Sequence, residues 1–386
     1  MKLQIQHFYK YTLLLFLTFT TCTKDELPVV QGDPFIELET ERLNQNESDF
    51  VLKLLKVDSE MPNIWSTFNL LRNYPIFVIT GENEGFFINP PVSEWPNSRI
   101  IIDEDFDGFE NLSIYRNNDL LTFAKSQMNG SLFQLSVYND FNIFIFDITY
   151  EIGNNFYIQY KNRNGHFFAS IFFHELFHDY QIRTVIDQWY DINFTQNISG
   201  YPLNSETLPY QILYFTALID AYDINNTTAR KTKILSYYVS INNKLLSLDT
   251  TNDNLIRNHG FWLEKLEGVA RYVEIYSTLN ALDNNIIDDP THGYKEFVDS
   301  LNTISSARTT YARRMFYHTG AGAIHLLKEL GYPDVENDLL IPTNTPFDLA
   351  DSFLNLNAQE MENALEEAKI AYNWDNILLR AQELLD

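Results

Sequence analysis

Two histidines and a glutamate in one short segment have the types and the spacing of a catalytic metal site. The segment FFHELFHDYQ places His174, Glu175 and His178 in a His-Glu-x-x-His pattern. On a helix, side chains four residues apart lie on the same face, so both imidazoles can reach one metal ion. The carboxylate of Glu175 could then accept a proton from a water molecule held at that metal. A purely structural pair of histidines is the alternative.

This chemistry requires the segment to be helical. Residues 170–189 contain no Gly or Pro, and their apolar residues recur at helical spacing. This apolar stripe consists of Ile171, Leu176, Phe177, Ile182 and Val185. The pattern predicts a helix that carries both histidines.

A catalytic zinc site needs a third protein ligand and keeps its fourth position for water. The strongest candidate lies in the predicted helix over residues 260–279, which contains Glu264, Glu267 and Glu274. Gly268 follows Glu267 directly, and a small residue there lets this helix approach a neighbouring helix closely. Glu267 is therefore the first choice and Glu264, one turn earlier, the second. The alternative for all three is an ordinary solvated helix acid.

The same segment resembles a known peptidase motif. Trp-Leu at 262–263 and EGVARYVE at 267–274 resemble the Trp-Leu-Asn-Glu-Gly-Phe-Ala-x-Tyr-x-Glu segment of gluzincin metallopeptidases of the aminopeptidase N type. The resemblance implies a zincin-like core that binds zinc and cleaves peptides or proteins. It also implies that Glu267 is the third zinc ligand, beside the two histidines, and that Glu175 is the general base.

The chain departs from that family in two respects. Between His178 and Glu267 lie 88 residues, where the family has about eighteen. The Gly-x-Met-Glu-Asn segment with which those aminopeptidases recognise a free amino terminus is absent. The resemblance therefore implies the zinc-binding core but not aminopeptidase specificity.

A third segment could supply an oxyanion donor. YARRMFYHTGAGAIHLL contains Tyr317 and His318, which are residue types that stabilise the oxyanion formed in peptide hydrolysis. The small residues 320–323 follow them, and the run resembles the Tyr-x-x-Gly-Ala segment of the same peptidases. Tyr317 is the first choice and His318 the second, and a tyrosine packed in the core is the alternative.

The N-terminus reads as a targeting segment. Residues 1–21 combine two lysines with the short apolar run YTLLLFLTF and end before Cys22, the one cysteine of the chain. Such a run is too short for a stable membrane span. The pattern resembles a bacterial lipoprotein signal in which Cys22 is lipidated, with a stray thiol as the alternative. Residues 22–34 would be a tether.

The localisation follows from this signal. The residues after Cys22, TKDE at 23–26, resemble the charged signal that sends some lipoproteins to the outer cell surface, with an ordinary polar linker as the alternative. The expected location is the outer membrane or cell surface, with lipid as the membrane anchor. The formal net charge of −25 argues against nucleic acid as a partner.

The periodicity of the rest of the chain predicts an α+β fold. Residues 35–165 alternate one helical pattern, at 37–56, with short strand patterns. These strand patterns lie at 76–80, 85–89, 100–102, 143–149 and 156–160. Residues 166–386 are predicted to be mainly helical, and the resemblance to gluzincins implies that they form a zincin-like catalytic domain. Its helical patterns lie at 206–223, 228–248, 252–282, 294–304, 309–330 and 358–385.

Two features of the first half bear on ligands. The strand pattern at 156–160 (FYIQY), joined to the motif helix by a turn at 162–165, is positioned to pair with an extended peptide substrate. Asp103, Asp105, Asp107 and Gly108 match the first half of an EF-hand calcium loop. However, Ile114 stands where the bidentate Glu belongs, so a solvated acidic turn is expected there rather than a calcium site.

The sequence as a whole favours a zinc metallopeptidase attached to the cell envelope. The alternative is a surface binding lipoprotein, a degenerate zincin that captures peptide or glycan without cleaving it. Zinc bound in stoichiometric amount would distinguish the enzyme from the binder.

Overall fold

The structure, a computed structural model, describes residues 42–68, 71, 74–90, 99–100, 112–128, 130–149, 167–185, 194–223, 225–282 and 301–386. The chain forms two compact units. The first comprises Met1–Ser48 and Arg72–Gly153, and the second comprises Asp49–Leu71 and Asn154–Asp386. The segment Asp49–Leu71 therefore belongs with the later, helical part of the chain, although it precedes the sheet in sequence.

A mixed sheet of six strands forms the first unit, in the order β3-β4-β2-β1-β6-β5. Its strands are β1 (Ile76–Ile79), β2 (Gly85–Ile88), β3 (Arg99–Ile100), β4 (Ile114–Arg116), β5 (Phe133–Tyr138) and β6 (Phe141–Asp147). Strand β1 pairs antiparallel with β2 and parallel with β6, so that Ile76 lies opposite both Ile88 and Phe144. Strands β5 and β6 form a hairpin. Its turn residues Asn139 and Asp140 both have positive φ, as a two-residue hairpin turn requires.

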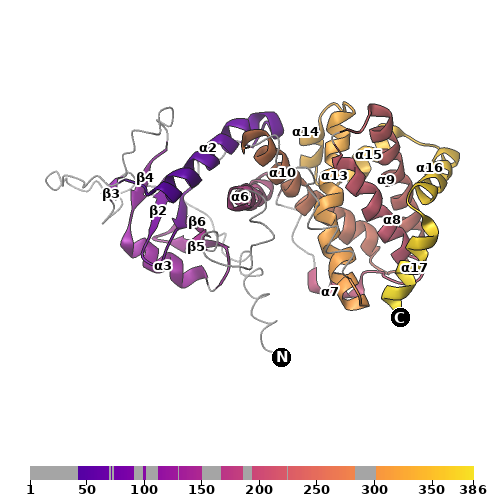
Figure 1. The fold of residues 1–386 in the computed structure, drawn as a ribbon, viewed down its shortest axis with the longest axis horizontal. Coiled ribbons are helices and arrows are strands. Elements are labelled where there is room, and N and C mark those ends of the chain that lie inside the picture. Colours follow the sequence, from indigo (N-terminus) through magenta and orange to yellow (C-terminus); the bar gives the residue numbers. More distant parts are fainter. Residues whose placement is uncertain are drawn as a thin grey trace. The chain divides into compact units, whose positions relative to one another are not determined.

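Helix α3 (Asn118–Met128) packs on one face of this sheet (Figure 1). Successive side chains of a strand point to opposite faces, so Phe77 and Ile79 of β1 share this face. They form one core cluster with Ile143 and Ile145 of β6 and the apolar residues of α3. The continuous apolar runs of β1 and β6 therefore supply side chains to this core.

A buried carboxylate fixes the start of helix α2 (Gln45–Ile64) to this sheet. Glu47 is fully buried and accepts hydrogen bonds from both terminal nitrogens of Arg116, at 2.9 and 2.6 Å. It also accepts from Thr80 Oγ1 at 2.8 Å and from the backbone N–H of Asn44 at 2.9 Å. Burial would raise the pKa of Glu47, but these hydrogen bonds lower it below its usual value.

The sequence predicted most of the described elements of the first half. The strand patterns at 76–80, 85–89, 100–102 and 143–149 correspond to β1, β2, β3 and β6. The helix expected at 37–56 is described from Gln45 and continues to Ile64. Helix α3 and strands β4 and β5 were not predicted. Several expectations lie outside the described residues: Cys22 and the signal and tether at 1–34, the calcium-like segment Asp103–Gly108, the substrate strand at 156–160 and the turn at 162–165.

The second unit is mainly helical, as predicted. Its elements after α2 are α6 (Phe167–Val185), α7 (Phe194–Gly200), α8 (Leu208–Ile219), η4 (Asp220–Tyr222), α9 (Thr228–Leu248), η5 (Ile256–Phe261), η6 (Glu264–Gly268), α10 (Val269–Leu282), α12 (Ile304–Thr309), η7 (Thr310–Arg314), α13 (Met315–Glu329), α14 (Val335–Leu340), α15 (Pro346–Leu354), α16 (Ala358–Ala371) and α17 (Trp374–Leu385). Three of these, η5, η6 and η7, are π-helical turns.

The predicted helices of this unit agree with the observed ones, except that residues 301–303 of the pattern at 294–304 are not helical and α12 begins at Ile304. The pattern at 228–248 coincides with α9, whose first turn is capped by the side chain of Thr227. The pattern at 252–282 is a helical run interrupted by two π-helical turns, and the pattern at 358–385 is split into α16 and α17 at Asn373. Most of the pattern at 294–304 lies outside the described residues. Within the described ranges, none of the helices combines the length and apolar character that a bilayer crossing requires.

Helix α13 is at the centre of the second unit. Helices α8, α9, α10 and α15 and the π-helical turn η6 all pack against it (Figure 1). Its contact with η6 is exceptionally close at two glycines. A Cβ on Gly268 would lie 2.6 Å from the Cα of Gly320, and a Cβ on Gly320 would lie 2.6 Å from the carbonyl oxygen of Glu264. The close approach predicted beside Glu267 is therefore confirmed.

Candidate metal centre

Helix α6 presents the two histidines of the motif on one face, next to a carboxylate from η6. The imidazole rings of His174 and His178 are perpendicular, with centroids 4.7 Å apart, and their Nε2 atoms are 3.1 Å apart. Oε2 of Glu267 lies 3.1 Å from Nε2 of His178 and 3.6 Å from Nε2 of His174. The structure thus brings together the three residues that the sequence selected as ligands.

The three atoms have the separations that a zinc ion requires. Ligands bound at about 2.0–2.1 Å and at tetrahedral angles are about 3.3–3.4 Å apart, and the observed distances of 3.1, 3.1 and 3.6 Å bracket that value. The side chains are largely buried, with 7 % of His174, 12 % of Glu267 and 18 % of His178 exposed. The remaining exposure lets solvent reach the cluster, as a catalytic site with an open fourth position needs. The donor set of two imidazoles and one carboxylate therefore fits zinc.

Each histidine has a partner at its other ring nitrogen. Nδ1 of His174 lies 3.0 Å from Oε2 of Glu274, and Arg271 forms an ion pair with the same carboxylate. Nδ1 of His178 lies 3.0 Å from Oε1 of Gln181. Such partners hold the imidazole ring so that Nε2 is free to bind a metal.

Neither partner was identified as such from the sequence, where Glu274 was only one of three candidate acids on its helix, although their spacing could have revealed them. Gln181 is three residues after His178, which places it on the same face of α6. Glu274 is seven residues, or two helical turns, after Glu267, which places both carboxylates on one side of their helix. Gln181 and Glu274 could therefore have been predicted by asking which polar side chains lie one or two helical turns beyond the metal ligands.

Charges within the cluster compensate one another. Burial would lower the pKa of His174, but hydrogen bonds with Glu267 and Glu274, together with the charge of Glu274, raise it to about 10. Burial would raise the pKa of Glu267, but the charge on His178 and hydrogen bonds from both histidines lower it well below its usual range. The acidic surroundings favour positive charge at the place where a cation would bind. Because such a cation replaces the proton on a histidine, its affinity must fall as the pH falls.

The carboxyl group of Glu175 belongs to the same electrostatic cluster. Burial raises its pKa above the usual value, opposed by the charges of His174 and His178 and assisted by those of Glu267 and Glu274. A carboxylate with a raised pKa accepts a proton more readily near neutral pH. Its position and electrostatics therefore suit a general base.

Of the two candidate oxyanion donors, the structure places Tyr317 at the centre. Its ring is parallel to that of His174, with centroids 5.9 Å apart, and its hydroxyl is a hydrogen-bond partner of Glu267. Burial and the charge of Glu267 raise the pKa of Tyr317 well above its usual value, which keeps the hydroxyl protonated. His318, the next residue on α13, is buried, and its carbonyl accepts a hydrogen bond from Tyr222 at 2.6 Å. Tyr317 therefore remains the first choice.

Glu264, the second choice for the third ligand, belongs to the core and not to the metal centre. It is fully buried, and its carboxyl group accepts hydrogen bonds from Tyr238, at 2.7 Å, and from Tyr214. Burial raises its pKa to about 8, opposed by a hydrogen bond with Thr319. The expectation that Glu264 and Glu267 share a face was wrong because η6 is a π-helical turn. Side chains three residues apart are rotated about the helix axis by about 300° on an α-helix, which leaves them about 60° apart. On a π-helix of ~4.4 residues per turn the rotation is only about 245°, so they point about 115° apart.

Comparisons with profiles of known protein families, with curated proteins and with solved structures give no match for this chain. What can be said of its function therefore depends on its own sequence and on the geometry of this centre.

Proposed function

We propose that this chain is a zinc-dependent hydrolase of peptide bonds with a zincin-like catalytic domain. The observation that carries the proposal is the convergence of His174, His178 and Glu267, whose ligand atoms all lie within 4.8 Å of one another. The geometry supports a metal centre of the zinc type. Peptide as the substrate class rests on the resemblance of the segment at 262–274 to gluzincin peptidases.

In this mechanism His174, His178 and Glu267 would hold the zinc ion. When bound, zinc lowers the pKa of water and polarises a carbonyl group. Glu175 accepts a proton from the attacking water and transfers it to the nitrogen of the leaving amine. The protonated hydroxyl of Tyr317 donates a hydrogen bond to the oxyanion that develops on the carbonyl oxygen. The partners at Nδ1 of each histidine keep the rings oriented throughout.

The proposal is tested by the metal content of two matched variants. Glu267→Gln and Glu264→Gln each replace one buried carboxyl group on the same helical turn. Glu267→Gln should lose zinc and hydrolysis together, because a ligand is removed. Glu264→Gln should retain both, because its carboxyl group faces Tyr214 and Tyr238 instead.

The measurements are zinc per chain by elemental analysis and cleavage of a peptide mixture by mass spectrometry. Wild-type protein that contains about one zinc per chain and cleaves peptides supports the proposal. Folded protein without zinc, or zinc retained equally in both variants, contradicts it. Stoichiometric zinc without cleavage of any peptide would refute the proposed hydrolase activity but would still support the proposed metal centre.

We also propose that the enzyme is attached to the cell envelope, in the outer membrane or at the cell surface, by lipid on Cys22. The basis is the signal-like sequence of residues 1–21, which lies outside the described residues. Cys22→Ala should shift the protein from the membrane fraction to the soluble fraction. An unchanged membrane fraction for this variant would refute the lipid anchor.

A further inference from the structure

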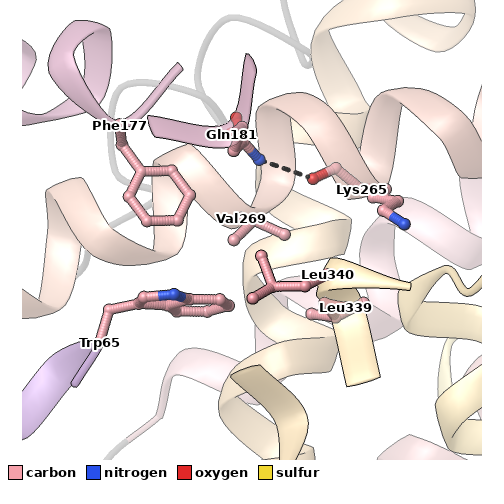
Figure 2. Close-up of a pocket in the computed structure, with 7 residues that line it drawn as sticks. All are labelled: Trp65, Phe177, Gln181, Lys265, Val269, Leu339 and Leu340. Atoms are coloured by element: carbon pink, nitrogen blue, oxygen red, sulfur yellow. Dashed lines mark hydrogen bonds between the residues drawn. The ribbon is translucent and has the colours of Figure 1, made fainter. Parts of the chain in front are cut away.

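One glutamine joins the two segments that supply the metal ligands. Gln181 is on α6, three residues after His178, and is 4 % exposed. Its Nε2 donates hydrogen bonds to the carbonyl oxygens of Lys265, at 3.2 Å, and of Leu266, at 3.1 Å. Figure 2 shows the hydrogen bond to Lys265. Its Oε1 lies 3.0 Å from Nδ1 of His178.

These contacts determine the orientation of the amide and, through it, the protonation of the histidine. A carbonyl oxygen can only accept, so the NH2 group of Gln181 must face Lys265 and Leu266. Its Oε1 must then face His178, and because Oε1 can only accept, Nδ1 of His178 must carry the proton. Nε2 of His178 is therefore the nitrogen that faces the centre, 3.1 Å from Glu267 Oε2. Without a metal it donates to this carboxylate, and a bound metal would take the place of that proton.

The hydrogen bonds that Gln181 donates to the carbonyl oxygens of Lys265 and Leu266 position the carboxylate ligand. Lys265 and Leu266 belong to η6, the π-helical turn that also carries Glu267. The hydrogen bonds from Gln181 bridge segments that are 84 and 85 residues apart in sequence. One side chain thus holds the histidine of one segment and the backbone of the turn that presents the glutamate of the other.

The surroundings of Gln181 are largely apolar. The cavity beside it has a volume of about 10 Å³ and is lined by Trp65, Phe177, Val269, Leu339 and Leu340 (Figure 2). A water molecule needs at least this much room and two or more polar partners. The lining supplies few polar groups besides Gln181 itself and Lys265, so the amide cannot be exchanged for a water bridge without loss.

We infer that Gln181 is a positioning residue of the metal centre, which accepts the Nδ1–H of His178 and fixes its ring relative to the turn that carries Glu267. The inference rests on the proposed zinc function for its purpose. Its geometric content, the protonation of His178 at Nδ1, can be measured without any metal.

The test compares Gln181→Met, Gln181→Glu and the control Gln211→Met. Methionine has the length of glutamine but neither donor nor acceptor of comparable strength. Glutamate keeps an acceptor for the Nδ1–H of His178 and loses the two donors to the carbonyls. Gln211 is the matched control, because it is also fully buried and hydrogen-bonded, to Tyr201 at 3.1 Å.

The first readout is the hydrogen-bonded proton on Nδ1 of His178 in zinc-free protein, from the ring nitrogen and proton shifts of histidine-labelled samples. Wild type, Gln181→Glu and Gln211→Met should show this proton, and Gln181→Met should lose it. The second readout is zinc affinity, measured by competition with a coloured chelator. Gln181→Met should bind zinc about 10- to 100-fold more weakly, Gln181→Glu should lose less, and Gln211→Met should match wild type.

Two results would overturn the inference. One is an unchanged Nδ1–H signal of His178 together with unchanged zinc affinity in Gln181→Met. The other is an equal loss of zinc affinity in Gln211→Met, which would assign the effect to general destabilisation. If Gln181→Met does not fold, Gln181→Glu decides, since loss of the Nδ1–H signal of His178 there contradicts the inference. Wild-type protein that binds no zinc but has His178 in the Nδ1–H form would refute the zinc function and leave the orienting role of Gln181 supported.

Discussion

The close contact between η6 and α13 makes Gly268→Ala a strong perturbation at the metal centre. The new Cβ would lie 2.6 Å from the Cα of Gly320, 3.0 Å from its carbonyl carbon and 3.0 Å from the carbonyl oxygen of Phe316. Ordinary carbon contacts are about 3.5–4.0 Å, so the two helices must separate by about 1 Å. All three neighbours are backbone atoms, which cannot move aside as a flexible side chain can.

The magnitude follows from two opposing effects. Alanine in place of glycine inside a helix gains about 0.5–1 kcal/mol. Forcing a methyl group into a packed interior costs about 1–3 kcal/mol, and a contact with backbone atoms belongs at the upper end of that range. We therefore expect Gly268→Ala to lower the free energy of unfolding by about 1–2 kcal/mol. The displacement also moves Glu267, and because metal–ligand distances tolerate about ±0.2 Å, zinc affinity should fall as well.

The assay is the midpoint of urea unfolding, followed by tryptophan fluorescence, with Gly200→Ala as control. A Cβ on Gly200 would lie 3.3 Å from Cδ1 of Leu255, the end of a flexible side chain. That contact can be relieved cheaply, so the control should be unchanged or slightly more stable. A loss of stability in Gly268→Ala without a loss in Gly200→Ala is the expected result. A Gly268→Ala variant at least as stable as wild type would refute the argument from backbone contact.

Three further predictions follow from the described contacts. Glu175→Gln should keep zinc but slow peptide cleavage by about 10²- to 10⁴-fold, whereas the neighbouring variant Asp179→Asn, measured in the same cleavage assay, should remain active. Glu264 has its pKa raised from 4.5 to about 8 by burial, so its contribution to stability is complete below pH 4.5 and is lost as the pH rises toward 8. The free energy of unfolding of wild type, measured with urea, should therefore fall relative to that of Glu264→Gln by up to about 1.4 kcal/mol per pH unit in that window. The same dependence of this free energy on pH in both proteins would contradict the assignment. Arg116→Leu should destabilise the first unit by about 3–5 kcal/mol, because it leaves the buried charge of Glu47 uncompensated. Since the pKa of Glu47 is lowered, wild type should lose this advantage as the pH falls below 4.5, and thermal unfolding at pH 7 and pH 4 measures both effects.

The elements with strong periodic patterns could be predicted from the sequence, and the weaker ones could not. Helix α9 was predicted to the residue because Thr227 and Asp249 bound a long amphipathic run. Strand β6 was visible as a continuous apolar run. Its partner β5 is only partly buried, so its alternation is weak. The two-residue turn at Asn139 and Asp140 was the signal that could have revealed the hairpin.

The ligand set was predictable in type but not fully in geometry. His174 and His178 are four residues apart on one helix, and local spacing alone brings them together. The choice between Glu264 and Glu267 depends on the π-helical turn η6, in which Gly268 lies close to Gly320 of α13. Helical spacing assumes about 3.6 residues per turn and so misassigns side chains wherever the helix is wider.

The distance in sequence between the two halves of the centre has a consequence for folding. A zinc ion bound by His178 and Glu267 closes a loop across 88 intervening residues, and closing so long a loop costs about 1.4 kcal/mol more chain entropy than one of about eighteen. A chain with one cysteine can form no internal disulfide. The metal would then act as the cross-link that such a chain otherwise lacks, stabilising the folded state in proportion to the logarithm of the free zinc concentration. Catalytic competence and resistance to unfolding would depend on the same ion.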